Sequence, residues 1–160
     1  MNKIDLFYKI NYPVFLCIGS TNIIGDSFAP KVGSILIENN IKNVYGTINK
    51  AVNSKNLENT IKKIKEIHKN APIIAIDAGL GKKSDIGKIK FEIGGINPRS
   101  AIDDSMPKIG SIHIIGIVAQ FSGKKNTIES LNKSNLDLVN SMSIEASKKI
   151  IEYFALKKAK

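Results

Sequence analysis

Two short apolar runs, at residues 14–18 and 73–76, constrain the fold more than any other feature of the chain. Neither run alternates with polar residues, so each predicts a strand covered on both faces, as in a parallel sheet between two layers of helices. The first run leads into a glycine-punctuated loop that carries Asp26, and the second is followed at once by Asp77. Because ligands bind at the carboxyl ends of strands in open α/β sheets, we expect both acids at one site.

The remaining periodicity predicts strands alternating with helices along the chain. Apolar residues at helical spacing indicate helices that start close to Asp26, that cover 56–70 and that cover 136–154. Further strands are predicted at 43–47, 87–93 and 109–119, and residues 94–108 form a loop. The run 87–93 alternates apolar and charged residues, which favours a half-exposed edge strand. We therefore predict one domain over 1–160, with its core at about 12–156, as an α/β three-layer α/β/α sandwich with a mainly parallel central sheet.

Composition narrows the class of protein and its compartment. The 160 residues are 42% hydrophobic and 24% charged, as in a soluble globular protein. No apolar run approaches the roughly 18 residues of a membrane span, and residues 1–6 lack the apolar core of a secretory signal. The expected location is the cytoplasm. The one cysteine, Cys17, lies in an apolar strand and is predicted to be a small buried hydrophobe rather than a reactive thiol.

The formal charge of +10 raises the question of nucleic-acid binding. The lysines are spread over the polar faces of predicted helices, and only residues 157–160 form a basic tail. Specific nucleic-acid recognition is therefore not expected, and a preference for an acidic partner is a lesser alternative. A nucleotide-binding module is also disfavoured, since the chain has neither a Walker-type motif nor the glycine spacing of a dinucleotide fingerprint. The oligomeric state stays open.

Each acid has a structural and a functional interpretation. Asp26 suits the N-cap of the helix that follows, or it is a reactive carboxylate that the helix dipole keeps ionised while the neighbouring glycines let the backbone approach a ligand. Asp77 either caps a turn at 78–81 or belongs to a site, because an acid at the end of an apolar strand is costly unless it is used or well bonded.

The histidines and the remaining acids are weaker candidates. His113 lies in a predicted strand, either as a hydrogen-bonded core residue or as the third member of a group with Asp26 and Asp77. Two carboxylates and an imidazole suit a divalent metal such as zinc or nickel. His68 is expected to be solvated, and Asp103 and Asp104 are expected to be surface acids of the loop before the next strand.

Several segments together resemble one protein family. The chain is similar to YyaC-type sporulation proteins, which are related to the spore germination protease and to hydrogenase maturation endopeptidases. The resemblance runs from about residue 13 to about residue 154. The segments that carry it are Cys17-Ile18-Gly19-Ser20-Thr21, Gly25-Asp26-Ser27-Phe28-Ala29-Pro30-Lys31-Val32-Gly33, Asn43-Val44-Tyr45-Gly46-Thr47, Ile74-Ala75-Ile76-Asp77-Ala78 with Leu80-Gly81, and Gly110-Ser111-Ile112-His113-Ile114-Ile115-Gly116-Ile117-Val118.

This resemblance implies a phosphorylase/hydrolase-like fold and a peptidase ancestry. It implies active-site roles for the acids at 26 and 77, and the maturation endopeptidases add a metal contacted by those acids and a histidine, for which His113 is the candidate here. Family members often have cysteine where Gly79 stands. The expected function is an endopeptidase acting on small spore proteins or another sporulation substrate. The alternative is a peptidase-fold protein that binds a partner or peptide without cutting it. The residues predicted to bind substrate are Gly19, Ser20, Gly25, Ser27 and Gly79.

Overall fold

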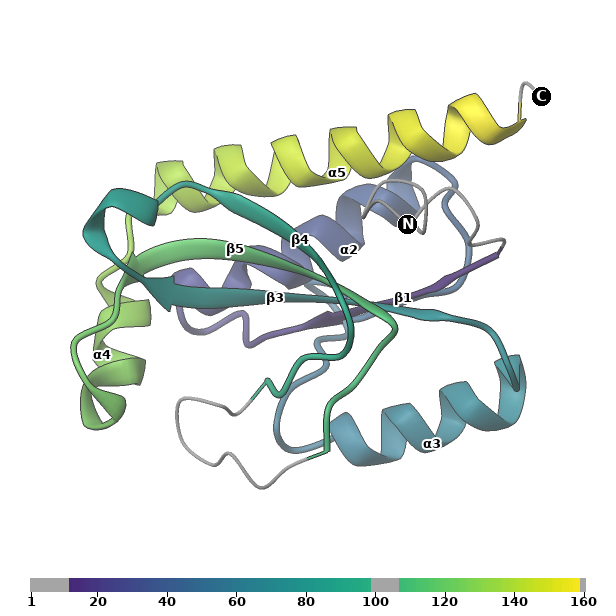
Figure 1. The fold of residues 1–160 in the computed structure, drawn as a ribbon, viewed down its shortest axis with the longest axis horizontal. Helices are drawn as coiled ribbons and strands as arrows, with labels where there is room; N and C mark the ends of the chain where they lie inside the picture. The colour runs from purple at the N-terminus through teal and green to yellow at the C-terminus, as the bar shows by residue number, and fades with distance from the viewer. Residues whose placement is uncertain (1–11, 99–106, 159–160) are drawn as a thin grey trace.

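A five-stranded, mainly parallel sheet forms the centre of the protein. The computed structural model describes residues 12–98 and 107–158 (Figure 1). The strand order is β2-β1-β3-β5-β4; β1, β2, β3 and β5 pair in parallel, and β4 pairs antiparallel with β5. The strands are β1 (Val14–Ile18), β2 (Val44–Tyr45), β3 (Ile73–Gly81), β4 (Ile89–Ile93) and β5 (Ile112–Gln120). This confirms the predicted α/β fold and its antiparallel edge strand.

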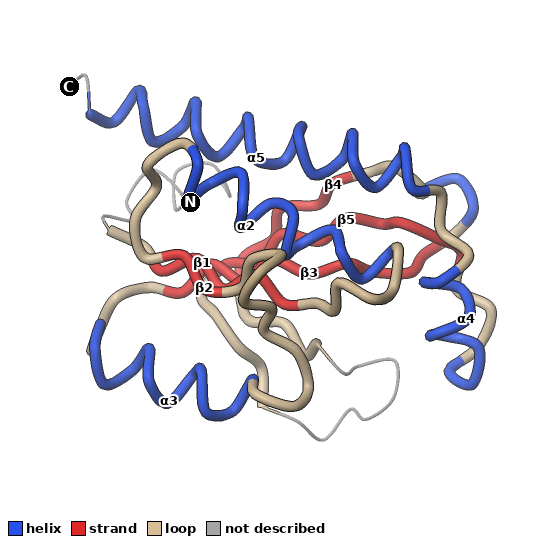
Figure 2. The backbone as a smooth tube through the Cα atoms, turned by 180° about the vertical axis from the view of Figure 1, so that it is seen from behind, coloured by secondary structure: helices blue, strands red, loops and turns tan. Residues whose placement is uncertain are grey.

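Helices cover both faces of the sheet. Helices α2 and α5 lie together on one face, and α3 and α4 lie on the other, as the two views in Figures 1 and 2 show. The predicted three-layer arrangement is therefore confirmed. The helices are α2 (Phe28–Glu38), α3 (Leu57–His68), α4 (Thr127–Asn132) and α5 (Leu136–Lys158), with three single 3₁₀ turns at η1 (Gly25–Ser27), η2 (Lys83–Asp85) and η3 (Lys124–Asn126).

The alternation of side chains along β1 explains why this strand has no polar residue. Phe15 and Cys17 belong to the apolar cluster formed with α2 and α5, whereas Leu16 and its alternate neighbours pack on the α3 face. Every residue of β1 is therefore buried. The prediction for Cys17 is confirmed, because its side chain is fully buried and burial raises the pKa of the thiol well above its ordinary value.

The structure corrects several predicted boundaries. Strand β3 continues through Gly81, so residues 78–81 extend the sheet and do not form the predicted turn. Strand β5 begins at Ile112, because residues 107–111 contribute only an isolated bridge at Ile109. Helix α4 was not predicted, since six residues are too few to show a helical repeat. No helix in the described part of the chain is long and apolar enough to span a membrane.

Candidate active site

The two acids predicted for one site lie where β1 ends beside β3. Ile18, the last residue of β1, is paired with Asp77 of β3, and β3 then continues alongside β5 without β1. The chain leaves β1 through Gly19 and returns to the sheet edge at η1, which contains Asp26. Both carboxylates line one cavity of about 340 Å³. The two apolar strands thus place Asp26 and Asp77 at the same cavity.

Asp26 is held by the loop that precedes it. The backbone N–H of Ser20 donates a hydrogen bond of 2.6 Å to Asp26 Oδ2. A Cβ atom at Gly19 would lie only 2.0 Å from the Asp26 carbonyl oxygen, so only glycine allows this close approach of the two backbone segments. Burial raises the pKa of Asp26, and the hydrogen bond from Ser20 opposes part of that rise.

The N-cap interpretation of Asp26 is wrong. Asp26 lies in the 3₁₀ turn before α2, and Ser27 occupies the N-cap position of that helix without a side-chain capping bond. The Asp26 carboxylate instead bonds back to Ser20, six residues earlier. The loop before α2 therefore determines the position of Asp26. The helix-start pattern in the sequence led to the wrong prediction of an N-cap.

Asp77 is the more perturbed of the two acids. Its side chain is 6% exposed. Burial is the largest cause that raises the pKa of Asp77 well above its ordinary range, and the negative charge of Asp26 raises it further. The backbone N–H of Ala78 hydrogen-bonds the carboxylate and lowers the pKa in part. Asp26 is therefore the acid that ionises first, and Asp77 holds its proton to higher pH.

The cavity around the acids has an apolar wall and a few polar groups. Strand β5 contributes Ile115 and Ile117 to the wall, and α4 contributes Thr127 and Leu131. Phe121 lies beyond the end of β5 and is 47% exposed. The other lining residues are Ala78, Gly79, Leu80, Ile96, Asn97, Pro98 and Lys124. The lining of this pocket thus combines two carboxylates with branched aliphatic side chains.

The structure does not bring His113 into the acid pair. Its Nδ1–H donates a 2.8 Å hydrogen bond to the Gly94 carbonyl, and its Nε2 lies 3.4 Å from Glu92 Oε2 of the neighbouring β4 strand. No three histidine, cysteine or carboxylate side chains converge into a metal-binding group within residues 12–98 and 107–158. A catalytic zinc site typically has three protein ligands, so the described donor set does not fit the predicted metal.

The loop residues predicted to bind substrate have different positions. Gly79 lines the cavity. Gly25 and Ser27 are buried in the fold, where a Cβ at Gly25 would lie 2.5 Å from Ser134 Oγ and where Ser27 Oγ donates to the Ile24 carbonyl. Gly19 and Ser20 hold Asp26, as described above. Gly19 and Ser20 thus position a carboxylate, and of the five predicted residues only Gly79 lines the cavity.

The second histidine and the two loop acids were the remaining candidates, and His68 does not line the cavity. Asp103 and Asp104 lie outside the described residues. His68 is half-buried, and its Nε2 is 2.8 Å from the Tyr45 hydroxyl, so the expectation of a solvated histidine is wrong. The ring of Tyr45 also packs edge-on against that of His68, which gives this histidine a structural contact between β2 and α3.

Sequence reasoning missed the wall supplied by α4. A signal was present, because Asn126 is followed three residues later by Glu129, a pattern typical of helix N-termini. The signal is weak because lysines stand at 124 and 125 and because the segment has few apolar residues. Thr127 and Leu131, which this helix places in the cavity, could not be assigned to the site without it.

Comparison with known proteins identifies the family of the chain. A Bacillus subtilis (strain 168) protein with the name "Uncharacterized protein YyaC" is 36% identical over 107 residues, which are 66% of this chain and 52% of that protein. The chain thus spans about half the length of this relative. A family described as "Protein of unknown function (DUF1256)" matches residues 4–149, nearly the whole chain. The protein therefore belongs to the DUF1256 family.

Proposed function

We propose that this protein is an endopeptidase that hydrolyses peptide bonds with Asp26 and Asp77 as its acid–base pair. The observation that carries the proposal is the buried Asp77 carboxyl beside Asp26, both lining one cavity. Neighbouring carboxyl groups whose pKa values are driven apart are suited to be base and acid in the same reaction. The peptidase ancestry that the sequence resemblance implies favours the same chemistry, as does a cavity large enough for a side chain.

The pKa directions assign a role to each acid. Ionised Asp26 removes a proton from a water molecule, whose oxygen attacks the carbonyl carbon of the scissile bond. Protonated Asp77 donates its proton to the amide nitrogen as the carbon–nitrogen bond breaks, so the products are a carboxylic acid and an amine. One proton then returns from Asp26 to Asp77, and the pair is ready for another cycle. Small spore proteins or another sporulation substrate in the cytoplasm are the proposed targets.

The proposal is tested by incubating the purified full chain with small proteins extracted from bacterial spores and with a proteome-derived peptide library. We expect discrete internal cleavage sites by mass spectrometry for the wild-type protein and none for Asp26→Asn/Asp77→Asn. The matched control is Asp85→Asn, because Asp85 pairs with Lys88 and Lys90 outside the cavity. Binding without cleavage by the wild type would favour the non-catalytic alternative and end the endopeptidase proposal.

Metal removal gives a second test of the chemistry. Because the described residues bring no third histidine, cysteine or carboxylate ligand to the acid pair, cleavage by the carboxylates alone is expected to survive dialysis against a chelator within about twofold. Rates are measured before dialysis, after dialysis, and after addition of zinc or nickel. Loss of cleavage that either metal restores would contradict the carboxylate-only pair.

A further inference from the structure

Strand β4 lies at one edge of the sheet. Among the described residues, no strand pairs with the side of β4 that faces away from β5. Figure 1 shows β4 along this edge, below α5. The edge of a sheet presents backbone N–H and C=O groups that can pair with a strand of another chain. The outer edge of β4 is therefore a candidate interaction surface.

The hydrogen bonds to β5 determine which residues of β4 face outward. On one side of the strand, the Lys88 carbonyl accepts a bond of 2.9 Å from β5, and on the other side the Gly94 N–H donates a bond of 2.8 Å toward β5. Hydrogen-bonded pairs recur at every second residue of an antiparallel ladder. Ile89 and Ile93, the first and last residues of β4, therefore direct their N–H and C=O groups to the outer edge.

The side chains of β4 divide between the two faces of the sheet. Ile89 and Phe91 pack against the apolar cluster formed with α2 and α5. Lys90 and Glu92 alternate with them and so belong to the opposite face. Their side chains are 42% and 47% exposed, respectively. The edge thus carries one positive and one negative charge, two residues apart on the same face.

Two copies of β4 can pair antiparallel about a two-fold axis at Phe91. In that register, Lys90 of each copy lies opposite Glu92 of the other, where opposite charges stabilise the pairing. These are non-hydrogen-bonded pairs, in which facing residues approach most closely. Ile89 of each copy lies opposite Ile93 of the other, and these residues exchange both of their N–H···O bonds. Both copies use the same surface, as a two-fold interface requires.

Other registers of this edge are disfavoured. Sliding one copy by two residues places Lys90 opposite Lys90 or Glu92 opposite Glu92, and like charges directly opposite each other destabilise a strand pair. Sliding it by one residue sets outward backbone groups opposite inward ones. The strand sequence Ile-Lys-Phe-Glu-Ile therefore selects one arrangement. Charges of a single sign would instead keep the edge unpaired.

The ion pairs of these two residues within the chain are loose. Lys90 Nζ lies 3.5 Å from Asp85 Oδ2, whereas Lys88 Nζ lies 2.7 Å from the same carboxylate. Glu92 Oε2 lies 3.4 Å from His113 Nε2, and this histidine is charged only when it is protonated. Exposed pairs of this kind contribute little stability. Lys90 and Glu92 can therefore pair with a second copy at little cost.

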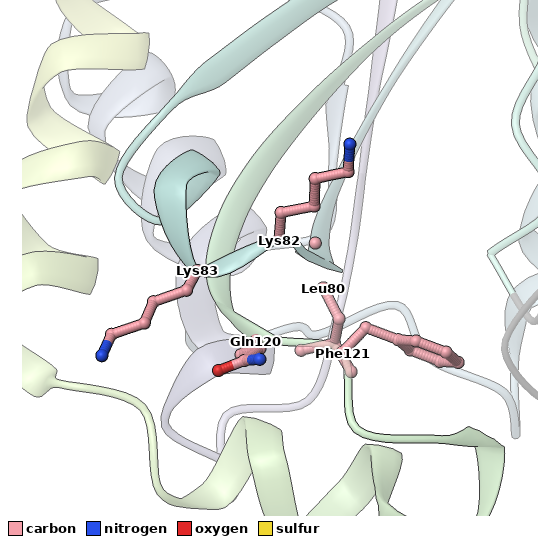
Figure 3. A pocket seen from close by; sticks show the side chains of 6 residues that line it. Leu80, Lys82, Lys83, Gln120 and Phe121 are labelled. Carbon is pink, nitrogen blue, oxygen red and sulfur yellow. The ribbon is translucent and has the colours of Figure 1, made fainter.

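The hollow beside the candidate active site specifies its occupant less well. This hollow of about 460 Å³ is lined by Leu80 and Phe121 and by two lysines, Lys82 and Lys83. Figure 3 shows the amines of these lysines pointing away from each other. The lysines therefore do not converge on one anion, whereas the charges of β4 define both a partner and a register.

We propose that two copies of the protein form a two-fold dimer through β4, which joins their sheets into one. Ile93, which is 46% exposed in a single copy, is covered in the dimer by Ile89 of the other copy. A five-residue strand buries less surface than a standard interface, so we expect a weak dimer with a Kd of about 10–100 µM. The inference does not depend on the proposed endopeptidase, because no residue of β4 lines the cavity of the two acids.

Charge reversal tests the register of the dimer. The full chain is measured by sedimentation equilibrium from about 5 to 500 µM, a range that brackets the expected Kd. Lys90→Glu and Glu92→Lys should each weaken dimerisation at least about tenfold, because each variant turns both charge pairs into like-charge pairs. An equimolar mixture of the two variants should dimerise within about threefold of wild type, because every facing pair in the mixed dimer again has opposite charges.

Lys88→Glu is the matched control. Lys88 also pairs with Asp85, and its reversal makes the same change in net charge as Lys90→Glu. In the proposed register, however, Lys88 lies opposite Gly94, which carries no charge, so dimerisation should stay within about twofold of wild type. Hydrogen exchange gives a second measurement, because the amides of Ile89 and Ile93 should exchange more slowly as the protein concentration rises through the Kd.

The outcomes distinguish this inference from the proposed function. A wild-type protein that stays monomeric throughout the concentration range would overturn the dimer. A dimer that persists unchanged in Lys90→Glu and in Glu92→Lys would lie on another surface and overturn the role of β4. Two folded variants that fail to dimerise when mixed would overturn the register. Dimerisation that is lost in each variant and restored by mixing, in a protein that cleaves nothing, would support the inference and contradict only the endopeptidase.

Discussion

Asp77→Asn is expected to lower the rate of peptide cleavage by about 10²- to 10⁴-fold, the usual contribution of a general acid. Asparagine keeps the shape of the side chain but has no carboxyl proton to give to the leaving amine. The same substitution is expected to stabilise the fold at neutral pH by about 0.5–2 kcal/mol, as do other replacements of strained active-site groups. The physical reason is that a carboxylate at this position is buried and repelled by Asp26.

The stability gain of Asp77→Asn over wild type should increase as pH rises. The pKa of Asp77 is higher in the folded protein than the roughly 3.9 of an unfolded aspartate, so the folded state binds the proton more tightly. Wild-type stability therefore falls as pH rises from about 4 through the folded pKa and stays lower above it. Asp77→Asn lacks this loss. The difference between the two melting temperatures should be smallest near pH 3 and largest above the folded pKa of Asp77.

Cleavage rates and calorimetric melting curves measured from pH 3 to 9 check both parts of this prediction. Asp85→Asn serves again as control, because the pKa of Asp85 is lowered by its bonds to Lys88 and Lys90, so its loss cannot stabilise the fold at neutral pH. An Asp77→Asn protein that cleaves at the wild-type rate would remove Asp77 from the reaction. A variant that melts lower than wild type at pH 8 would instead give its carboxylate a stabilising role.

Gly19→Ala is expected to destabilise the protein by about 3 kcal/mol, at the upper end of what overpacking costs. The added methyl would lie 2.0 Å from the Asp26 carbonyl oxygen, which is a backbone atom and cannot rotate away. The loop must therefore shift and carry Asp26 with it. Cleavage should fall further than stability explains, even where the variant is fully folded. Urea unfolding followed by circular dichroism measures the first effect, and rates at low temperature measure the second.

Gly81→Ala provides a comparison within the same sheet. The atom nearest to its added methyl is Ile117 Cγ2 at 3.1 Å, which belongs to a side chain that can adjust. We expect this variant to stay within about 1 kcal/mol of wild type. If Gly19→Ala were equally mild, the backbone contact between residue 19 and Asp26 would not be what holds the carboxylate.

The pairing of the two acids could be predicted because it depends on strands with a strong signal. Residues 14–18 and 73–76 are apolar without interruption, and the resulting parallel register sets Ile18 opposite Asp77. The sequence also showed the glycines near Asp26, but it did not show that Gly19 allows a close contact with the backbone of Asp26. Gly19 resembles part of a ligand cradle until the structure shows a backbone carbonyl packed against it.

The remainder of the site depends on contacts that leave no periodic pattern. His113 shares a face of β5 with Ile115, and only the path of the chain around Gly94 decides that its ring bonds a backbone carbonyl. Gly94 has a φ of +103°, a conformation that favours glycine. The place of Thr127 in the cavity wall depends likewise on how the six-residue helix α4 docks against β5. Such features arise from tertiary packing, which a single sequence does not display.

The two carboxylates belong to parts of the fold that differ in the free energy needed to unfold them locally. Asp77 lies within a strand paired on both sides, to Ile18 and to Ile115, and can be displaced only by opening the sheet. Asp26 is held by a loop whose tip, at Thr21 and Asn22, is exposed. Local unfolding of a loop requires less free energy than unfolding of a central strand. The acid pair can therefore be taken apart and reassembled while the sheet stays intact, which makes the Ser20 amide a natural hydrogen-exchange reporter of the assembled state.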